Sequence, residues 1–351
     1  MSSVSLYRKY RPQDFKSIRG QEQITSALSA QIKEKKIGHA YIFAGSRGLG
    51  KTSIARIFAE ELGCTSKDLY EIDAASNNSV EDIRNLTENV YTLPFESPYK
   101  VYILDEAHML SKSAWNAFLK TLEEPPAHVI FILATTELSK VPDTVQSRCQ
   151  VFEFKKPTRA VLAKLIADVA KDEGYTLEGT VADLVALLAD GSYRDALSTL
   201  EKVLASSTDK KITREEAEQA TGAPKLELLE DLLSALADDS MEKALSVIRK
   251  SEKNDVDMNL YLTLVLEYMR NILLVRHAPE LRNEIEAEVG EDMYKKIESF
   301  SGAKTGKLDH TTLKVFIDIA SALRYAPIAA LPFELAIYDL FSSTLPEGRT
   351  G

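Results

Sequence analysis

The stretch Gly45-Ser-Arg-Gly-Leu-Gly-Lys51-Thr52 decides the fold class, because it matches the pattern G-x-x-x-x-G-K-[ST] in full. It follows an apolar run, Ala40–Ala44, that is typical of a buried strand, and it precedes a helical pattern from Ser53 to Leu62. Glycines let backbone N–H groups curl around phosphate oxygens, and the N-terminus of the following helix adds positive potential. The stretch is therefore predicted to bind the phosphates of a nucleotide.

Two side chains of this loop have predicted roles. Lys51 is expected to reach the β- and γ-phosphates, and the hydroxyl of Thr52 is expected to bind Mg²⁺. A glycine-rich turn without a ligand is the alternative, which the full motif in its strand–helix context disfavours. The residues expected to contact the nucleotide are Gly45, Ser46, Arg47, Gly48, Leu49, Gly50, Lys51, Thr52 and Ser53.

A second apolar run, Val101-Tyr-Ile-Leu-Asp105-Glu106, ends in two carboxylates. At the carboxyl end of a parallel strand they face the ligand crevice. Asp105 suits a magnesium ligand, and Glu106 suits the general base that polarises the attacking water. Two solvated acids at a turn are the alternative. The letters Asp105-Glu-Ala-His108 also match a helicase class, but residues 158–351 read as all helix and offer no second sheet domain.

Alternation of apolar runs and helical patterns in the first part of the chain predicts a parallel sheet covered on both faces. Beyond Thr158 only helical patterns are found, so the fold class is α/β followed by all-α. Predicted capping boxes at Ser79 with Asp82 and at Thr213 with Glu216 mark two helix starts. The predicted strands are Ala40–Ala44, Leu69–Asp73, Val101–Leu104, Val129–Ala134 and Val151–Phe154.

Composition excludes several classes of protein. The chain has 351 residues, 44% of them hydrophobic, with no apolar run of the ~20 residues that span a bilayer and no signal-like start. A cytoplasmic protein without a membrane partner is expected. Its two cysteines, Cys64 and Cys149, give no disulfide framework and cannot alone form a four-ligand zinc site. A net charge of −10 disfavours tight DNA binding by the isolated chain, so DNA contacts are expected through local basic patches or within an assembly.

Several separated motifs resemble, in sequence order, those of the gamma/tau subunits of bacterial DNA polymerase III clamp loaders, which are AAA+ ATPases. The resemblance implies a RecA-like sheet domain over residues 1–157, a small helical lid over 158–221, a helical collar for oligomerisation over 222–345, and a tail over 346–351. The motifs are Tyr7-Arg-Lys-Tyr-Arg-Pro12, Gly20-Gln-Glu22, Glu71-Ile-Asp-Ala-Ala-Ser76, Asn116-Ala-Phe-Leu-Lys-Thr-Leu-Glu-Glu-Pro-Pro126, Leu133-Ala-Thr-Thr136, Ser147-Arg148-Cys149, Gly191-Ser-Tyr-Arg194-Asp-Ala196 and Leu331-Pro-Phe-Glu-Leu-Ala-Ile337.

The resemblance also implies roles for single residues. Thr136 would orient the water or sense the γ-phosphate, and Arg194 would reach the nucleotide of its own subunit from the lid. Arg148 would enter the neighbouring subunit's site as an arginine finger. Tyr7 and Arg11, in the basic N-terminal arm, would lie beside the adenine. Without the resemblance, these residues read as a strand-end threonine, surface arginines and a solvated arm.

The function that the resemblance implies is ATP-dependent opening and loading of a sliding clamp onto primed DNA. The expected cofactors are ATP and magnesium. The expected partners are loader subunits of the delta and delta-prime type, the sliding clamp and primer–template DNA, within a pentameric hetero-oligomer. Lys112 and Lys120 lie in the region that faces DNA in this family. Cys149 is expected to be a small packed residue and not a nucleophile.

The sequence departs from the family at the zinc module, which typically uses four cysteines. Cys64 is followed by Thr65-Ser-Lys-Asp68, so three ligands are absent and no zinc is predicted. Small subunits of replication factor C also lack the module, but Ala74-Ala-Ser76 and Thr136 favour the bacterial type. A loader subunit without catalysis and a branch-migration motor are two further hypotheses. The length matches the short gamma form or a piece of a longer chain.

Overall fold

The computed structural model describes residues 4–207, 209–254, 256–289, 291–302 and 306–342. Contacts divide the chain into two compact units. The first comprises residues 1–165 with 186–198, and the second comprises residues 166–185 with 199–351. Among the described residues, no helix combines the length and apolar character that crossing a membrane requires.

A five-stranded parallel sheet forms the centre of the first unit, with the order β2-β3-β4-β1-β5. Continuous apolar runs bury β1, β3 and β4 almost completely, as expected for inner strands covered on both faces. The strands are β1 Ala40–Ala44, β2 Leu69–Asp73, β3 Lys100–Asp105, β4 Val129–Thr135 and β5 Gln150–Glu153. The predicted strands are confirmed, with ends that differ by at most one residue.

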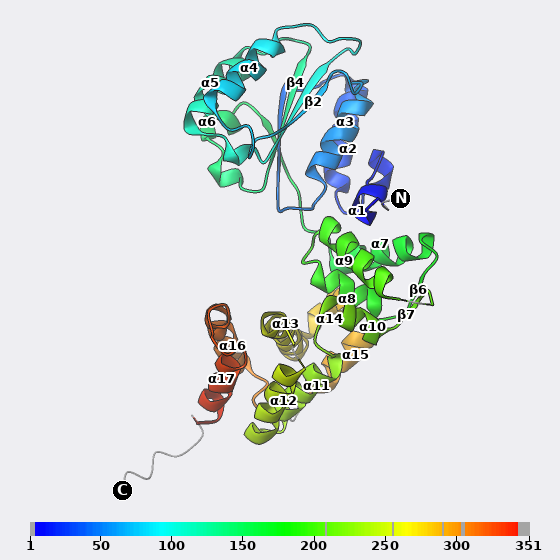
Figure 1. Ribbon diagram of the computed structural model, residues 1–351, viewed down its shortest axis with the longest axis vertical. Helices are drawn as coiled ribbons and strands as arrows, with labels where there is room; N and C mark the ends of the chain where they lie inside the picture. The colour runs from blue at the N-terminus through cyan, green and yellow to red at the C-terminus, as the bar shows by residue number, and fades with distance from the viewer. Residues whose placement is uncertain (1–3, 208, 255, 290, 303–305, 343–351) are drawn as a thin grey trace. The chain divides into compact units, whose positions relative to one another are not determined.

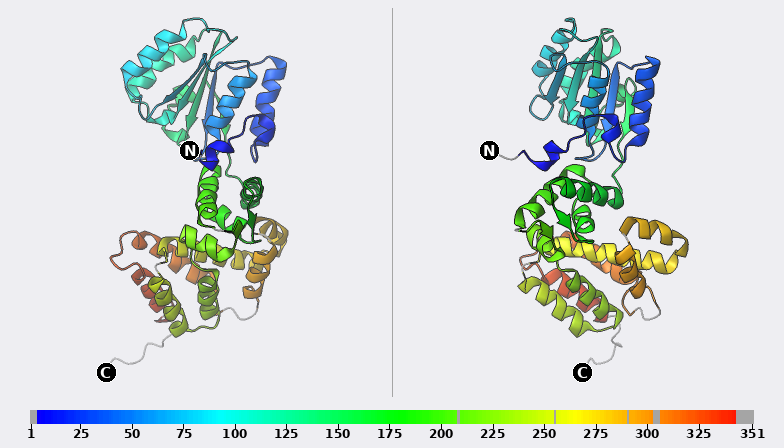
Figure 2. Two further views of the ribbon diagram at one scale, coloured as in Figure 1. Left: turned by 45° about the vertical axis from the view of Figure 1, so that its right-hand side comes forward. Right: turned by 90° about the vertical axis from the view of Figure 1, so that its right-hand side faces the viewer.

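Helices cover both faces of this sheet (Figures 1 and 2). On one face, α2 Glu22–Glu34 and α3 Lys51–Glu61 pack against the apolar side chains of β1 and β4 that point toward that face. On the other face, α4 Val80–Val90 and α5 Lys112–Glu123 enclose a second apolar cluster. The predicted α/β class is confirmed. The short segments of this unit are α1 Leu6–Lys9, η1 Phe15–Ser17, η2 Ala107–Met109, η3 Leu138–Lys140 and α6 Asp143–Gln146.

The rest of the chain is mostly helical, as predicted. The boundaries between the two units fall inside three of its helices, α7 Arg159–Asp172, α8 Val181–Leu188 and α9 Tyr193–Ser206. The division into lid and collar at residue 222 therefore stays a prediction, and the predicted tail 346–351 lies outside the described residues. The remaining helices are α10 Arg214–Thr221, α11 Leu226–Ala237, α12 Met241–Lys253, α13 Met258–His277, η4 Pro279–Leu281, α14 Arg282–Val289, α15 Glu291–Phe300, α16 His310–Leu323 and α17 Leu331–Ser342.

The prediction that strands stop at Thr158 is wrong at one place. Two short strands, β6 Thr176–Leu177 and β7 Lys211–Ile212, pair in parallel within the second unit. Each has only two residues, which is too short for a periodic pattern in the sequence. Their pairing is set by the packing of the intervening helices and not by local propensity.

The predicted capping boxes are confirmed at both helix starts. The hydroxyl of Ser79 accepts from the N–H of Asp82, whose carboxylate accepts from the N–H of Ser79. Thr213 and Glu216 make the same reciprocal pair at the start of α10. Each box satisfies two N–H groups that a helix start leaves without partners.

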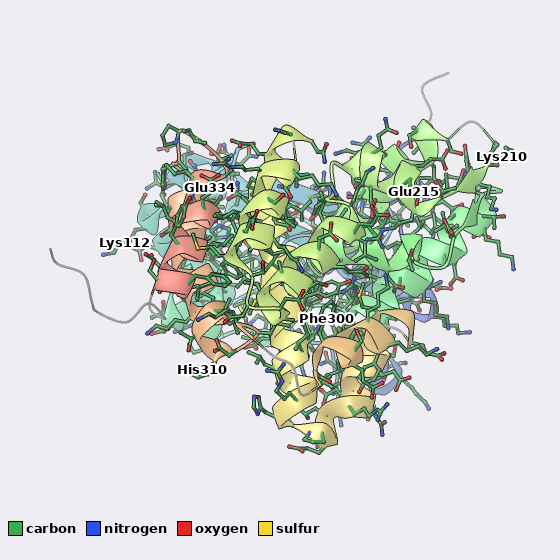
Figure 3. The ribbon with its side chains drawn as sticks, turned by 90° about the horizontal axis from the view of Figure 1, so that it is seen from below. Lys112, Lys210, Glu215, Phe300, His310 and Glu334 are labelled. Carbon is green, nitrogen blue, oxygen red and sulfur yellow. The ribbon has the colours of Figure 1, made fainter. Side chains whose placement is uncertain are left out.

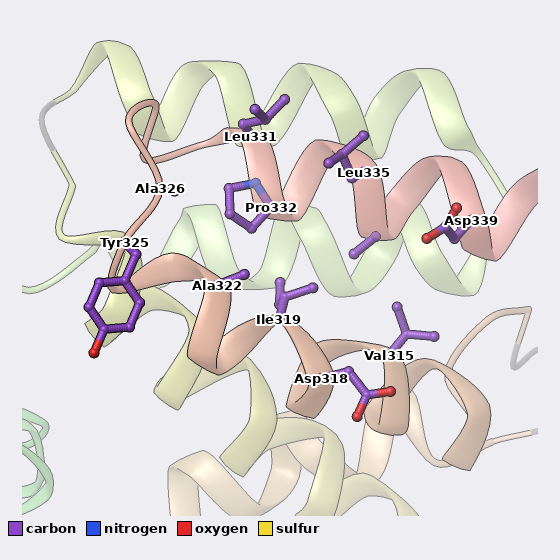
Figure 4. Close-up of a pocket in the computed structure, with 11 residues that line it drawn as sticks. Val315, Asp318, Ile319, Ala322, Tyr325, Ala326, Leu331, Pro332, Leu335 and Asp339 are labelled. Carbon is purple, nitrogen blue, oxygen red and sulfur yellow. The ribbon is translucent and has the colours of Figure 1, made fainter.

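Helices α16 and α17 enclose an apolar groove in the second unit (Figure 4). The groove has a volume of about 470 Å³, and two carboxylates, Asp318 and Asp339, lie among its apolar residues. Tyr325, two residues after the end of α16, is 86% exposed. Figure 3 marks His310 at the start of α16, Glu334 on α17 and Phe300 at the end of α15. An exposed apolar surface of this kind is typical of a protein contact.

Candidate nucleotide site

The loop after β1 contains glycines at positions whose backbone and surroundings disfavour any other residue. Gly45 and Gly48 both have positive φ, at 148° and 78°. A Cβ on Gly45 would lie 2.8 Å from the carbonyl oxygen of Phe154, and a Cβ on Gly48 would lie 2.0 Å from Oγ of Ser192. These glycines let the loop curl tightly against β5 and the start of α9 before α3 begins at Lys51.

Lys51 is buried at the mouth of this loop. Its ammonium donates to the carbonyl oxygens of Gly45, at 2.7 Å, and Ser46, at 2.9 Å. Burial lowers the pKa of Lys51, while the nearby charges of Glu106 and Asp105 act in the opposite direction. The loop and the acidic strand end therefore lie close enough to interact, and Lys51 offers a positive charge inside the curl of the loop.

Thr52 and Asp105 meet as the motif predicts. The hydroxyl of Thr52 donates to Oδ2 of Asp105 over 3.1 Å, although the two residues lie on different elements. The other oxygen of this carboxylate, Oδ1, accepts the backbone N–H of Glu106. A hydroxyl and a carboxylate are the hard oxygen ligands that Mg²⁺ prefers, and they fit a magnesium ion held between the loop and the strand end.

Glu106 is held in an unusual backbone conformation beside Thr136. Its φ of 48° lies in the left-handed region, which costs a non-glycine residue free energy. The hydroxyl of Thr136 donates to Oε2 of Glu106 over 3.0 Å. The ends of β3 and β4 thus bring together the two residues that the sequence analysis predicted to contact the attacking water.

The start of α9 packs against the phosphate loop from the lid segment. The backbone N–H of Tyr193 donates to the carbonyl of Gly48, and the hydroxyl of Tyr193 donates to the carbonyl of Arg19. The guanidinium of Arg194 lies 4.8 Å from the centre of the Tyr7 ring. A cation at this distance over an aromatic face is attracted by the ring. Arg194 and the N-terminal arm are therefore both near the loop, within the first unit.

Arg11, the second arm residue of the prediction, reaches α3. Its Nε donates to Oγ of Ser53 over 2.9 Å. Burial lowers the pKa of Arg11, and the positive charge of Arg56 adds to this effect. Arg56 in turn forms an ion pair with Glu71 on β2. The N-terminal arm is thus held beside the phosphate loop by a specific contact with α3. The basic character of the arm in the sequence did not predict this contact.

The remaining loop residues differ in what they can offer. Ser46 and Arg47 are exposed, whereas the side chain of Leu49 is buried in the apolar core with α2 and α3. Leu49 can therefore contribute only its backbone to a ligand. Sequence reasoning missed Ser192 and His108 as neighbours of the site. The first precedes Arg194 in a quoted motif, and the second lies two positions after Glu106.

Arg148 lies far from the phosphate loop of its own chain. The register pairs Gln150, at the start of β5, with Tyr41, near the start of β1, whereas the loop follows the end of β1. The guanidinium of Arg148 donates to Oε1 of Glu123 and to the carbonyl of Thr144, both at 2.6 Å. It therefore lies at the edge of the sheet where strands start, opposite the edge that carries Lys51 and Glu106.

The two cysteines are free thiols in packed surroundings. Burial raises the pKa of Cys64 to about 11 and that of Cys149 to about 12, so both thiols stay protonated at neutral pH. A protonated thiol is a poor nucleophile and a poor metal ligand. Within the part of the chain that the structure describes, no cluster of three or more His, Cys, Asp or Glu side chains is arranged for a metal ion. The absence of zinc remains a prediction.

Purified protein is expected to contain no stoichiometric zinc, because Cys64 lacks the three further thiolates that the family's module supplies. Metal analysis by mass spectrometry measures this directly. Treatment with a strong chelator should leave the melting temperature unchanged, since removal of a structural zinc would unfold its site. One zinc per chain, or a chelator-induced drop in melting temperature, contradicts the prediction.

Comparison with known proteins places this site in a family. The family profile described as "DNA polymerase III, delta subunit" matches residues 20–79 and 66–158, which cover the sheet and the phosphate loop. "DNA polymerase III subunit gamma" of Buchnera aphidicola is 35% identical over 85% of this chain and 87% of its own length. The chain belongs to the DNA polymerase III gamma/tau family. The predicted resemblance is confirmed, and the bacterial type is preferred to replication factor C.

Other members of the gamma/tau family are longer than the matched region. "DNA polymerase III subunit tau" of Bacillus subtilis is 40% identical over 82% of this chain but only 54% of its own length. The gamma/tau subunit of Mycobacterium tuberculosis is 33% identical over 91% of this chain and 58% of its own length. The chain thus spans little more than half the length of these relatives.

The fold is also shared with a solved structure from outside the gamma/tau family. RuvB of Thermotoga maritima, a Holliday junction branch migration motor, superposes with a TM-score of 0.52 over 65% of this chain and 80% of that chain. The sequence identity is 21%, so the likeness concerns the fold alone. It confirms the predicted fold class, a parallel α/β domain followed by helices. No strand pair is found within the described residues from 222 to 342, so the branch-migration hypothesis gains no support there.

Proposed function

We propose that the chain is an ATP-hydrolysing clamp-loader subunit that helps to open a sliding clamp and place it on primed DNA. The observation that carries the proposal is the meeting of Thr52 with Asp105 and of Glu106 with Thr136 at one edge of the sheet, beside Lys51. A phosphate cradle, a magnesium ligand set and a base held beside them are the parts that phosphoryl transfer to water requires. Membership of the gamma/tau family supports the clamp as the target.

The proposed chemistry divides among six side chains of the site. Lys51 would exchange its loop carbonyls for the β- and γ-phosphates, and Thr52 with Asp105 would hold a magnesium ion, which would supply positive charge beside them. Glu106 takes the proton of the attacking water, while Thr136 orients the carboxylate. Magnesium supplies charge stabilisation when bound. We also assign to Arg194 a contact with the nucleotide of its own subunit from the lid, and its position over the Tyr7 ring supports this assignment.

The proposed assembly is a pentameric hetero-oligomer with delta- and delta-prime-type subunits, in the cytoplasm. We assign oligomerisation to the collar, residues 222–345. The apolar groove between α16 and α17 supports this assignment, because such a surface suits another protein chain. Because the overall charge of −10 disfavours DNA binding by the isolated chain, we assign DNA contact to the assembly, with exposed Lys112 and Lys120 on α5 as candidate contacts.

The expected result is that primed DNA and a sliding clamp together raise the ATPase rate of the assembled loader by about tenfold or more. The physical reason is that the finger and base act only when neighbouring subunits are aligned, and bound partners favour that arrangement. Steady-state ATPase assays with the clamp alone, DNA alone and both measure this. A control clamp that cannot close into a ring should give no such rise. An equal rate under all conditions contradicts clamp loading even if ATP is hydrolysed.

A further inference from the structure

His108 lies between two carboxylates at the edge of the candidate site. Its side chain is only 6% exposed, and it lies in the short helix η2 directly after the acidic strand end. Nδ1 of the ring is 3.4 Å from Oε2 of Glu106, and Nε2 is 3.5 Å from Oε1 of Glu137. Because a carboxylate only accepts hydrogen bonds, both ring nitrogens face groups that favour a donor.

The ring is held in this orientation by a buried hydroxyl. Nδ1 of His108 is 3.1 Å from Oγ1 of Thr135, the last residue of β4. Thr135 is fully buried, and its hydroxyl also accepts the backbone N–H of Glu137. The same hydroxyl thus fixes the ring and the loop that carries the second carboxylate. A buried side chain with such neighbours has little rotational freedom.

The second carboxylate has a partner on its far side. The ammonium of Lys140 lies 2.8 Å from Oε1 of Glu137. The hydrogen bond from Lys140 lowers the pKa of Glu137, and the charge of Lys140 adds to this, so Glu137 is ionised at neutral pH. A continuous chain of contacts therefore runs from Lys140 through Glu137 and His108 to Glu106.

The contacts at Glu106 involve only one of its two carboxylate oxygens among the described residues. Within the described part of the chain, the hydrogen bond from Thr136 and the approach of His108 both fall on Oε2. The other oxygen, Oε1, is then the one that can accept a proton from water.

We propose that His108 is a positioning residue for hydrolysis, one that holds Oε2 of Glu106 so that Oε1 is presented to the attacking water. The inference rests on the proposed ATPase function of the same site and goes beyond it, because neither the phosphate-loop motif nor the base motif assigns a role to this histidine. A carboxylate fixed on one oxygen loses less freedom when it takes the proton, and a base displaced by about 1 Å can lose ~100-fold in rate.

Three substitutions of His108 separate positioning from simple packing. His108→Asn keeps a donor near the position of Nδ1, His108→Gln keeps one near Nε2, and His108→Ala removes both. Single-turnover hydrolysis with protein in excess over ATP gives the chemical rate, and equilibrium binding of ATP gives the affinity. We expect His108→Ala and His108→Gln to lower the rate about tenfold, and His108→Asn to stay within about threefold of the parent. ATP affinity should change by less than about twofold in all three.

The outcomes that overturn the inference are specific. A rate within about twofold of the parent for His108→Ala removes the positioning role. Equal slowing in all three variants, or a parallel loss of ATP affinity, shows that the histidine only supports the packing. If His108→Ala does not fold, the contrast between Asn and Gln decides. Glu106→Gln is measured alongside: if it hydrolyses ATP at the parental rate, the proposed function itself fails, whatever His108 does.

Discussion

Replacing Glu106 with Gln is expected to leave ATP binding intact and to lower the hydrolysis rate by about 10²–10⁴-fold. The amide keeps the shape of the side chain and can still accept the hydroxyl of Thr136, but it cannot take a proton from water. Lys51→Ala should have the opposite effect. It removes a buried cation that we expect to reach the phosphates, so the dissociation constant for ATP should rise by about 100-fold or more.

The measurement pairs two assays on each variant. Equilibrium binding of labelled ATP reports affinity, and single-turnover hydrolysis reports chemistry. Lys36→Ala and Glu60→Gln serve as matched controls, because both residues are exposed on the same unit and lie outside the site. Parental turnover in Glu106→Gln would eliminate the base assignment. Parental ATP affinity in Lys51→Ala would eliminate the assignment of the phosphate loop.

The sheet and the centre of the site were predictable because both depend on local sequence. Inner strands such as β3 and β4 are apolar throughout, and strand ends of a parallel sheet converge at one edge. The hydrogen bond between Thr52 and Asp105 follows from this arrangement, because the motifs place both residues near the carboxyl ends of strands. Chemistry encoded by a motif at a strand end is therefore readable from one sequence.

What could not be predicted depends on contacts between segments far apart in the chain. The approach of Glu137 to His108 requires the loop after β4 to fold back over the end of β3. The stacking of Arg194 on Tyr7 joins residues from two ends of the first unit. Short polar segments carry no periodicity that would fix such approaches, and their geometry follows from the packed elements around them.

The last expectation concerns Arg148, which should act only on ATP bound to a neighbouring subunit. Tyr41, which pairs with Gln150 in the register, and Gly45 of the phosphate loop are separated by four positions along β1. At ~3.3 Å per residue, this is about 13 Å of strand, and Arg148 precedes Gln150. Its ion pair with Glu123, at the end of α5, also directs it to the edge opposite the loop.

The isolated chain should accordingly bind ATP and hydrolyse it slowly, and assembly should raise the rate. Arg148→Ala should abolish that rise, by up to ~10³–10⁵-fold if the finger acts as in other NTPases, without weakening ATP binding by the monomer. The variant should fold, because a half-exposed ion pair such as the one with Glu123 contributes at most ~1 kcal/mol. Arg84→Ala, at an exposed arginine on α4, is the matched control.

Mixing two inactive variants distinguishes action within one chain from action between chains. Arg148→Ala subunits keep an intact loop, and Lys51→Ala subunits keep an intact finger. In oligomers that contain both, some interfaces pair the loop of the first with the finger of the second, so ATPase activity should partly return. Native mass spectrometry verifies that mixed oligomers have formed. Verified mixed oligomers without recovered activity would rule out action in trans, and full activity in a monomeric parent would remove the need for a finger.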